Sequence, residues 1–190
     1  MSEIPTTLLS ILAALGLAAA CGFRVFVPLL VVSLAQRAGL LGLSDGFAWI
    51  GSTPALICLS LATALEIAAY YLPVFDNLLD SVATPAAIVA GILVSAAVMT
   101  DIDPWLRWTL ATIAGGSLAA AVQLPTVAAR GLSTATTAGL ANPVVSTGEL
   151  ALASTFSGLA VLWPLLLPLA ALGAVVFFYR RLRRREPVPA

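Results

Sequence analysis

Long apolar segments follow one another along most of the chain and are separated by short polar stretches. An apolar run of about 17–25 residues can cross a hydrocarbon core roughly 30 Å thick as a helix. The pattern therefore predicts an all-α polytopic membrane protein with about six transmembrane or half-membrane helices. We expect them within residues 6–34, 53–72, 83–100, 105–124 and, as two short helices, 148–179.

Prolines and glycines indicate where these helices begin or break. Gly22-Phe23-Arg24 interrupts the first run, which should form one long kinked helix or two short pieces. Thr84-Pro85 has the form of a cap followed by a proline in the first helical turn. The last run would be about 48 Å long as one helix, so we expect it to break at Trp163-Pro164.

Composition supports the membrane class. The 190 residues are 61% hydrophobic and only 9% charged, whereas soluble domains carry about 25% charged residues. The chain has no Lys and no His, which excludes His-based metal sites and proton relays. Cys21 and Cys58 lie inside apolar segments, and we interpret both as buried thiols.

Charge placement predicts a topology. Five of the nine basic residues are arginines within 180–185, so the positive-inside rule places this tail in the cytoplasm. With six crossings the N-terminus is cytoplasmic too, and the turn at 101–104 lies outside. The four tryptophans then fall at the outer helix ends and the three tyrosines at the inner ends, as interfacial aromatic residues should.

We expect one integral membrane domain over residues 1–179, followed by a basic tail at 180–190. Three helices on each side of the turn would form halves 1–100 and 105–179 of opposite topology. Inverted repeats of this kind are common in transporters, with the substrate site at the interface between the repeats.

Arg24 and Glu66 are the charged residues set most deeply in apolar sequence. An ionised group at membrane depth costs about 2.5–3.5 kcal/mol on insertion scales, so each should have a partner or face a water-filled cavity. One hypothesis is that Arg24 binds an anionic group while Glu66 takes up a proton or a cation. The alternative is a structural Arg24–Glu66 ion pair that holds two helices together.

The stretch 72–85 is predicted to be a cytoplasmic loop that carries Asp76, Asn77 and Asp80. Carboxylates four residues apart share one face of a helical turn. Together with the amide they could bind a hard cation, or one carboxylate could hold a proton. Alternatively, Asp80 only favours the start of the next helix through its dipole.

A second polar stretch, 125–147, is also predicted to be a loop, with Arg130 inside it and Asn142-Pro143 opening a helix. Free N–H groups at a helix N-terminus attract anions, so Arg130 and Asn142 could bind one. Glu149 would oppose this unless it is protonated or paired with Arg130, and a plain capped helix is the alternative. The predicted substrate-binding residues are Arg24, Asn77, Arg130 and Asn142, and the predicted ion- or proton-coupling residues are Glu66, Asp76, Asp80 and Glu149.

Three clusters carry a resemblance to a known family. They are Gly22-Phe23-Arg24-Val25-Phe26-Val27-Pro28-Leu29-Leu30, Pro73-Val74-Phe75-Asp76-Asn77-Leu78-Leu79-Asp80 with Thr84-Pro85 and Gly91, and Ala129-Arg130 with Asn142-Pro143-Val144-Val145-Ser146. These clusters resemble an uncharacterised bacterial membrane family, domain-of-unknown-function family 4126. The resemblance covers about residues 10–175. It implies an inner-membrane location and no established activity.

No enzyme signature is present: Ser154 and Ser157 have no histidine partner, and there is no phosphate-binding loop. We expect no cofactor, no bound metal and no nucleic-acid partner. The chain is predicted to be a small inner-membrane transporter or channel for an anionic or lipid-like solute, in contact with membrane lipids and forming a homo-oligomer. The alternative is a non-transporting scaffold or accessory subunit whose intramembrane charges are structural pairs.

Overall fold

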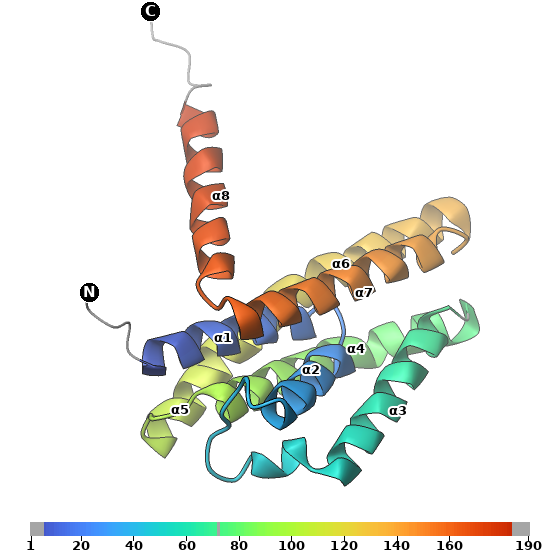
Figure 1. The fold of residues 1–190 in the computed structure, drawn as a ribbon. Coiled ribbons are helices and arrows are strands. Elements are labelled where there is room, and N and C mark those ends of the chain that lie inside the picture. The colour runs from blue at the N-terminus through green and yellow to red at the C-terminus, as the bar shows by residue number, and fades with distance from the viewer. Residues whose placement is uncertain (1–5, 72, 184–190) are drawn as a thin grey trace, which may run out of the picture.

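The computed structural model describes residues 6–71 and 73–183, with the side chains of 73–81 and of part of the last helix outside the description. The described residues form helices joined by turns, with no β-strand among them, as predicted (Figure 1). The elements in order are α1 (Thr6–Cys21), α2 (Phe26–Arg37), the 3₁₀ turn η1 (Ala48–Gly51), α3 (Thr53–Tyr70), α4 (Pro73–Val98), α5 (Pro104–Leu110), the π-helical turn η2 (Ala111–Gly115), α6 (Gly116–Thr137), α7 (Asn142–Leu162) and α8 (Leu166–Arg183).

Three of these helices are long and apolar enough to cross a membrane: Thr53–Tyr70, Asn142–Leu162 and Pro104–Thr137, the last of which joins α5, η2 and α6. Shorter apolar helices lie beside them at Thr6–Cys21, Phe26–Arg37 and Val82–Val98. The molecule is therefore a helical bundle of the membrane type.

The first apolar run forms two helices that enter the bundle and turn back. At the start of α1, the Ser10 hydroxyl accepts a hydrogen bond from the Thr100 N–H at 3.3 Å. After α2, the Ser44 N–H donates to the Ala97 carbonyl at 2.8 Å. Both open ends of the α1–α2 pair thus lie where α4 ends, and residues 22–25 form its inner tip (Figure 1).

This path corrects the predicted topology. The predicted six crossings include 6–34 as one crossing, but this part of the chain returns to the end from which it entered. The N-terminal end of α1 and the turn at 101–104 therefore lie at the same end of the bundle, not at opposite ends. We call this the tryptophan end, because its segments contain Trp49, Trp105, Trp108 and Trp163.

Residues 73–85 do not form the predicted loop. Helix α4 already begins at Pro73, and Pro85 lies inside it rather than in its first turn. Pro73 suits the first turn because its missing N–H would have no partner there. Pro85 is tolerated because neighbouring helices support a helix that has lost one backbone hydrogen bond.

The prediction of a loop over 125–147 is also wrong for most of its length. The helix that begins at Pro104 continues through Pro125 to Thr137, and α7 already begins at Asn142. The connection is a short turn, in which Ala138 and Gly139 have positive φ values of 53° and 83°. The predicted break in the last apolar run is confirmed, since α7 ends at Leu162 and α8 begins at Leu166.

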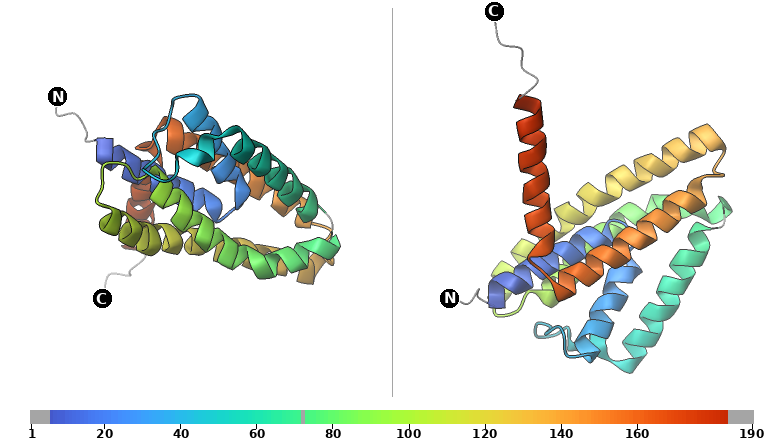
Figure 2. Two further views of the ribbon diagram at one scale, coloured as in Figure 1. Left: turned by 90° about the horizontal axis from the view of Figure 1, so that it is seen from below. Right: turned by 45° about the horizontal axis from the view of Figure 1, so that its top comes forward.

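Helix α1 forms the centre of the bundle and packs against α4, α6 and α7 (Figure 2). Small residues allow close approach: a Cβ added at Gly91 of α4 would lie 2.6 Å from Ala119 Cβ of α6. Such contacts drive helix association in lipid, where apolar burial contributes little. Cys21 lies in this core as predicted, whereas Cys58 is exposed on α3.

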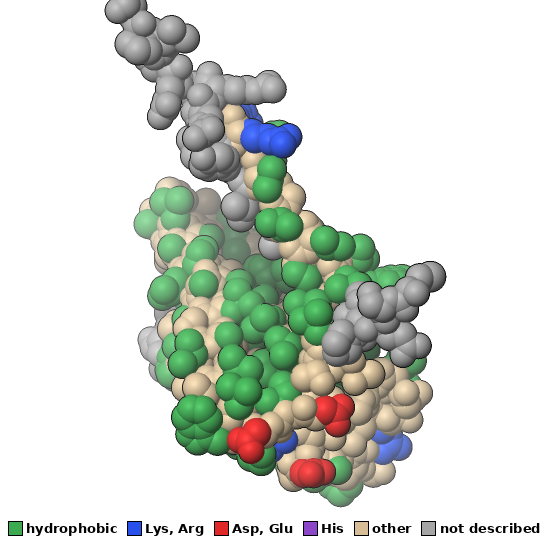
Figure 3. Space-filling view, turned by 90° about the vertical axis from the view of Figure 1, so that its left-hand side faces the viewer, with side chains coloured by type: hydrophobic (Ala, Val, Ile, Leu, Met, Phe, Trp, Pro, Cys, Tyr) green, Lys and Arg blue, Asp and Glu red, His purple; other side chains and the backbone are tan. Residues whose placement is uncertain are grey.

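The outer surface fits a lipid environment. Apolar side chains such as Leu61 and Leu65 of α3 and Leu132 of α6 are exposed along the sides of the bundle, and acidic side chains gather at the lower edge of the view from the tryptophan end (Figure 3). Asp45, Asp101, Asp103 and Arg107 line a polar recess of about 430 Å³ at this end. Among the described residues, Asp45, Asp101, Asp103 and Arg107 thus lie at the rim of the bundle, whereas Arg24, Glu66, Arg130 and Glu149 are buried inside it.

Candidate functional site

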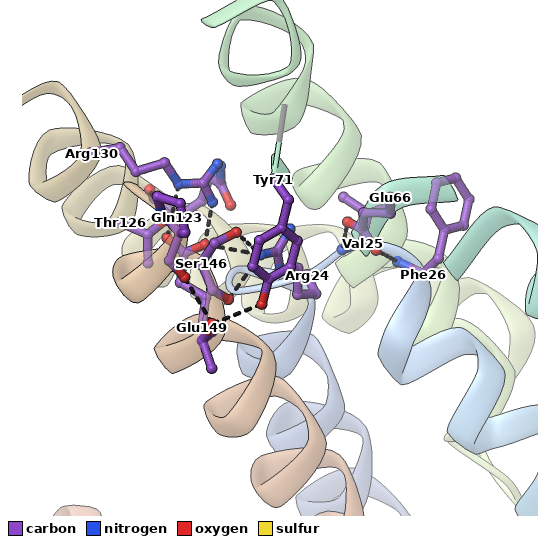
Figure 4. A network of polar contacts seen from close by, with 12 residues as sticks. Arg24, Val25, Phe26, Glu66, Tyr71, Gln123, Thr126, Arg130, Ser146 and Glu149 are labelled. Atoms are coloured by element: carbon purple, nitrogen blue, oxygen red, sulfur yellow. Dashed lines mark hydrogen bonds and ion pairs between the residues drawn. The ribbon is translucent and has the colours of Figure 1, made fainter. Parts of the chain in front are cut away.

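Residues from four separate helical segments meet inside the bundle. The tip of the α1–α2 pair contributes Arg24, α3 contributes Tyr70, α6 contributes Arg130, and α7 contributes Glu149. Figure 4 shows Arg24, Arg130, Ser146 and Glu149 pointing toward one another. We call Arg24, Tyr70, Arg130, Ser146 and Glu149 the arginine cluster.

Arg130 and Glu149 form a buried two-point ion pair. Arg130 Nε donates to Glu149 Oε1 at 3.1 Å, and Arg130 Nη2 donates to Glu149 Oε2. Their side chains are only 1% and 4% exposed. A planar guanidinium matches a carboxylate with two parallel charge-assisted hydrogen bonds, so this pair joins α6 to α7. The sequence predicts that Glu149 opposes an anion near Arg130 unless it is protonated or paired with this arginine. The structure shows this pair.

Arg24 contacts the same carboxylate from the other side. Its Nη2 donates to the Ser146 carbonyl at 2.9 Å and to the Ser146 hydroxyl, and lies 3.7 Å from Glu149 Oε2. Among the described residues, neither Nε nor Nη1 of Arg24 has a hydrogen-bond partner, although the side chain is 1% exposed. A buried donor without an acceptor costs about 1–3 kcal/mol, and more when it is charged, so the arrangement favours a bound acceptor.

Tyr70 provides an aromatic surface for both arginines. The Cζ atoms of Arg24 and Arg130 lie 4.0 and 3.9 Å from the centroid of its ring. A guanidinium over an aromatic ring is attracted by the ring quadrupole, most strongly when water is excluded. Tyr70 is buried, so it stabilises two cations close together in a place with little solvent.

Glu66 does not pair with Arg24, which excludes the predicted structural ion pair. Its Oε1 accepts the Val25 N–H at 2.7 Å, and its Oε2 accepts the Phe26 N–H at 3.1 Å (Figure 4). These are backbone groups at the start of α2, so Glu66 satisfies donors that have no partner within the helix and faces its positive dipole end. The charged partner of Arg24 is Glu149 instead.

The structure does not place the remaining predicted residues in the arginine cluster. Asn142 begins α7, and its Nδ2 donates to Thr134 Oγ1 at 3.0 Å. Asp76, Asn77 and Asp80 lie in the first turns of α4, but their side chains lie outside the described residues. Their predicted binding and coupling roles therefore stay predictions.

Two cavities adjoin the arginine cluster. The first has a volume of about 440 Å³, lies between α2, α3 and α4, and is lined by Glu66 and Tyr70 among apolar residues. The second has a volume of about 450 Å³, lies between the α1–α2 tip, α6 and α7, and is lined by Glu149 and Thr126 among apolar residues. Each cavity thus has a charged residue in a mainly apolar wall.

Comparison with known families assigns the chain. The family described as "Domain of unknown function (DUF4126)" matches residues 11–184. The chain belongs to this family. The resemblance carried by the three sequence clusters is thereby confirmed. No curated protein and no solved structure matches the chain.

Two members of the arginine cluster were missed in this DUF4126 chain. Tyr70 was interpreted only as an interfacial aromatic residue, and Ser146 only as part of a family cluster. Tyr70 lies four residues after Glu66, and Ser146 lies three residues before Glu149, so each shares a helix face with a buried acid. That spacing is the signal that could have identified them.

Proposed function

We propose that this protein is a small transporter or channel that moves a small anionic or lipid-like solute past Arg24 and Arg130. The observation that carries the proposal is the buried Arg24 guanidinium at the tip of a broken helix pair, with two nitrogen atoms that donate to no described residue. Many transporters build their substrate sites from discontinuous helices. An anionic group would supply the missing acceptors.

In this proposal, Glu149 and the transported anion bind Arg24 in turn. Glu149 already binds both arginines, so an incoming anion competes with it for Arg24 while Arg130 keeps its bidentate contact. This competition limits the affinity for the anion and lets it leave. Glu66, Asp76, Asp80 and Glu149 are the residues that we propose to carry an accompanying proton or cation.

The size and lining of the second cavity support a lipid-like solute among the candidates. Its volume of about 450 Å³ falls within the roughly 300–1,000 Å³ that small-molecule sites occupy. Its wall is mainly apolar and meets the arginine cluster at Glu149. An apolar chain would lie in this cavity with its head group toward Arg24 and Arg130.

Flux through proteoliposomes tests the proposal. Wild-type protein should release at least one anion from a panel of chloride, phosphate and short- and long-chain carboxylates. Arg24→Gln should slow that flux about tenfold or more, because it removes a charge-assisted donor worth about 1.5–3 kcal/mol. Arg37→Gln is the control, since Arg37 is exposed and donates to the Gly51 carbonyl. Wild-type flux no faster than that of empty liposomes would contradict the proposal.

A non-transporting scaffold is the second candidate. It is favoured by the number of contacts that the arginine cluster makes within the protein: Arg24 and Arg130 together join the α1–α2 tip to α3, α6 and α7. If the cluster only holds helices together, Arg24→Gln should lower thermal stability and no anion should cross the membrane in the presence of the wild-type protein.

We also propose a multi-pass location in a bacterial inner membrane, as a homo-oligomer with both termini cytoplasmic. Since α1 begins at the tryptophan end and α8 begins there too, the termini share a side if α8 lies along the membrane surface. Its steep angle to the bundle supports this placement (Figure 1), as do Arg180 and Arg181 near its end. An inverted repeat stays a prediction: a helix pair opens the first half, and one continuous helix opens the second.

Cysteine labelling in intact and permeabilised cells tests this topology. Cys58→Ser provides the background, because Cys21 is buried. We expect Thr6→Cys to react with a membrane-impermeant maleimide only after permeabilisation, and Leu140→Cys, in the exposed α6–α7 turn, to react in intact cells. Labelling of both positions from the same side would contradict the placement of the bundle across the membrane.

A further inference from the structure

The first cavity holds a buried carboxylate in a mainly apolar wall. Among the described residues that line it, Glu66 is the only charged one, and its side chain is 9% exposed. Apolar side chains from three helices make up most of the remaining wall, including Val25, Phe26, Leu65 and Val82. A ligand in this cavity therefore meets one negative charge and a broad apolar surface.

Glu66 has no cationic side chain as a direct partner within the described chain. Its hydrogen bonds come from the backbone N–H groups of Val25 and Phe26, whereas Arg24 and Arg130 form ion pairs with Glu149. A carboxylate has about four lone-pair sites, so two remain available. A carboxylate at membrane depth without a directly paired cation is costly, and the positive end of α2 offsets only part of that cost.

We propose that this cavity binds a hydrophobic organic cation, with its positive charge at Glu66 and its apolar groups against the α2, α3 and α4 walls. The negative charge of Glu66 disfavours an anion. A hard metal ion requires six or more oxygen ligands, which the described residues of this lining do not supply. A neutral hydrocarbon chain would fill the space but place no positive charge beside Glu66.

This site differs from the anion site that we propose at Arg24. Glu66 faces the cavity between α2, α3 and α4, whereas Arg24 contacts Ser146 and Glu149 of α7. The proposed cation site does not depend on transport, so the proposal applies whether the protein is a transporter or a scaffold. A volume of about 440 Å³ suits one small-molecule ligand, and one carboxylate matches a single positive charge.

A pair of probes with the same shape and opposite charge tests the proposal. Tetraphenylphosphonium should bind the full-length protein in detergent saturably and with one site per chain, as measured by equilibrium dialysis. Tetraphenylborate should neither bind saturably nor displace it. Glu66→Gln keeps a side-chain oxygen for one backbone N–H, and it should weaken tetraphenylphosphonium binding by roughly tenfold or more because the charge is lost.

A second pair of variants tests the cavity without changing Glu66. Ala62→Leu adds three carbon atoms to the cavity wall and should abolish saturable binding. Ala64→Leu adds the same atoms to an exposed position of α3 and should leave binding unchanged. Three results would each overturn the proposal: equal affinity for both probes, unchanged binding in both Glu66→Gln and Ala62→Leu, or no saturable binding of tetraphenylphosphonium. The liposome flux result is independent of all three, so failure of the transport proposal is distinguishable from failure of this one.

Discussion

Arg130→Ala is expected to lower the free energy of unfolding by about 3–5 kcal/mol, because it leaves the buried Glu149 carboxylate without its two-point partner. Arg130 and Glu149 are almost completely buried, and each oxygen of Glu149 accepts a hydrogen bond from Arg130. The contact of Arg130 with the Tyr70 ring is lost as well. Denaturant unfolding in detergent, followed by circular dichroism, measures the change.

Two further variants show whether this cost comes from the pair itself. Arg130→Ala with Glu149→Ala should cost less than the sum of the two single variants, because the second change removes the charge that the first leaves unpaired. Arg37→Ala is the matched control, since Arg37 is exposed, and it should stay within about 0.5 kcal/mol of the wild type. An Arg130→Ala protein as stable as Arg37→Ala would show that the ion pair does not hold α6 to α7.

Gly22→Ala and Gly131→Ala are expected to change stability in opposite directions. A Cβ at Gly22 would lie 2.6 Å from both the Ala119 carbonyl oxygen and Val122 Cβ of α6. Overpacking of this kind costs about 1–3 kcal/mol. Gly131 lies in α6 with open space around its Cβ position, and alanine there should stabilise the helix by roughly 0.5–1 kcal/mol.

The Gly22 variant should also impair function, because the residue lies two positions before Arg24 at the tip of the α1–α2 pair. Thermal unfolding of both variants, together with the flux assay, measures the two effects. A stabilised Gly22→Ala protein would show that the tip is not packed tightly against α6.

Sequence reasoning identified the residues of the site better than their partners. Arg24 was selected because a charge in apolar sequence is costly, and Arg130 and Glu149 because they flank the helix start at Asn142-Pro143; both signals are visible without a structure. The partner of Arg24 was not identified from the sequence, because both Glu66 and Glu149 are acids in apolar segments. Which acid faces Arg24 depends on where the α1–α2 tip reaches in the bundle.

The two wrong loop predictions share a physical cause. Residues 72–85 and 125–147 were interpreted as loops because they are polar and contain prolines, yet α4 and α6 run through Pro85 and Pro125. Inside a bundle, a polar helical residue can bind a partner on another helix, and neighbouring helices compensate for a missing backbone hydrogen bond. Local composition therefore underestimates helix length wherever polar groups meet inside the bundle.

The sequence by itself determined the membrane class, the helical architecture and the family of this protein. Hydropathy, proline placement and residue clusters are local properties, and each is read directly from neighbouring positions in the chain. The tertiary structure alone decided that the first apolar run turns back at Arg24, that Glu149 serves two arginines around Tyr70, and that Glu66 holds the start of α2. These features depend on which helices pack side by side, and that choice is made by close contacts between small residues that are distant in the sequence.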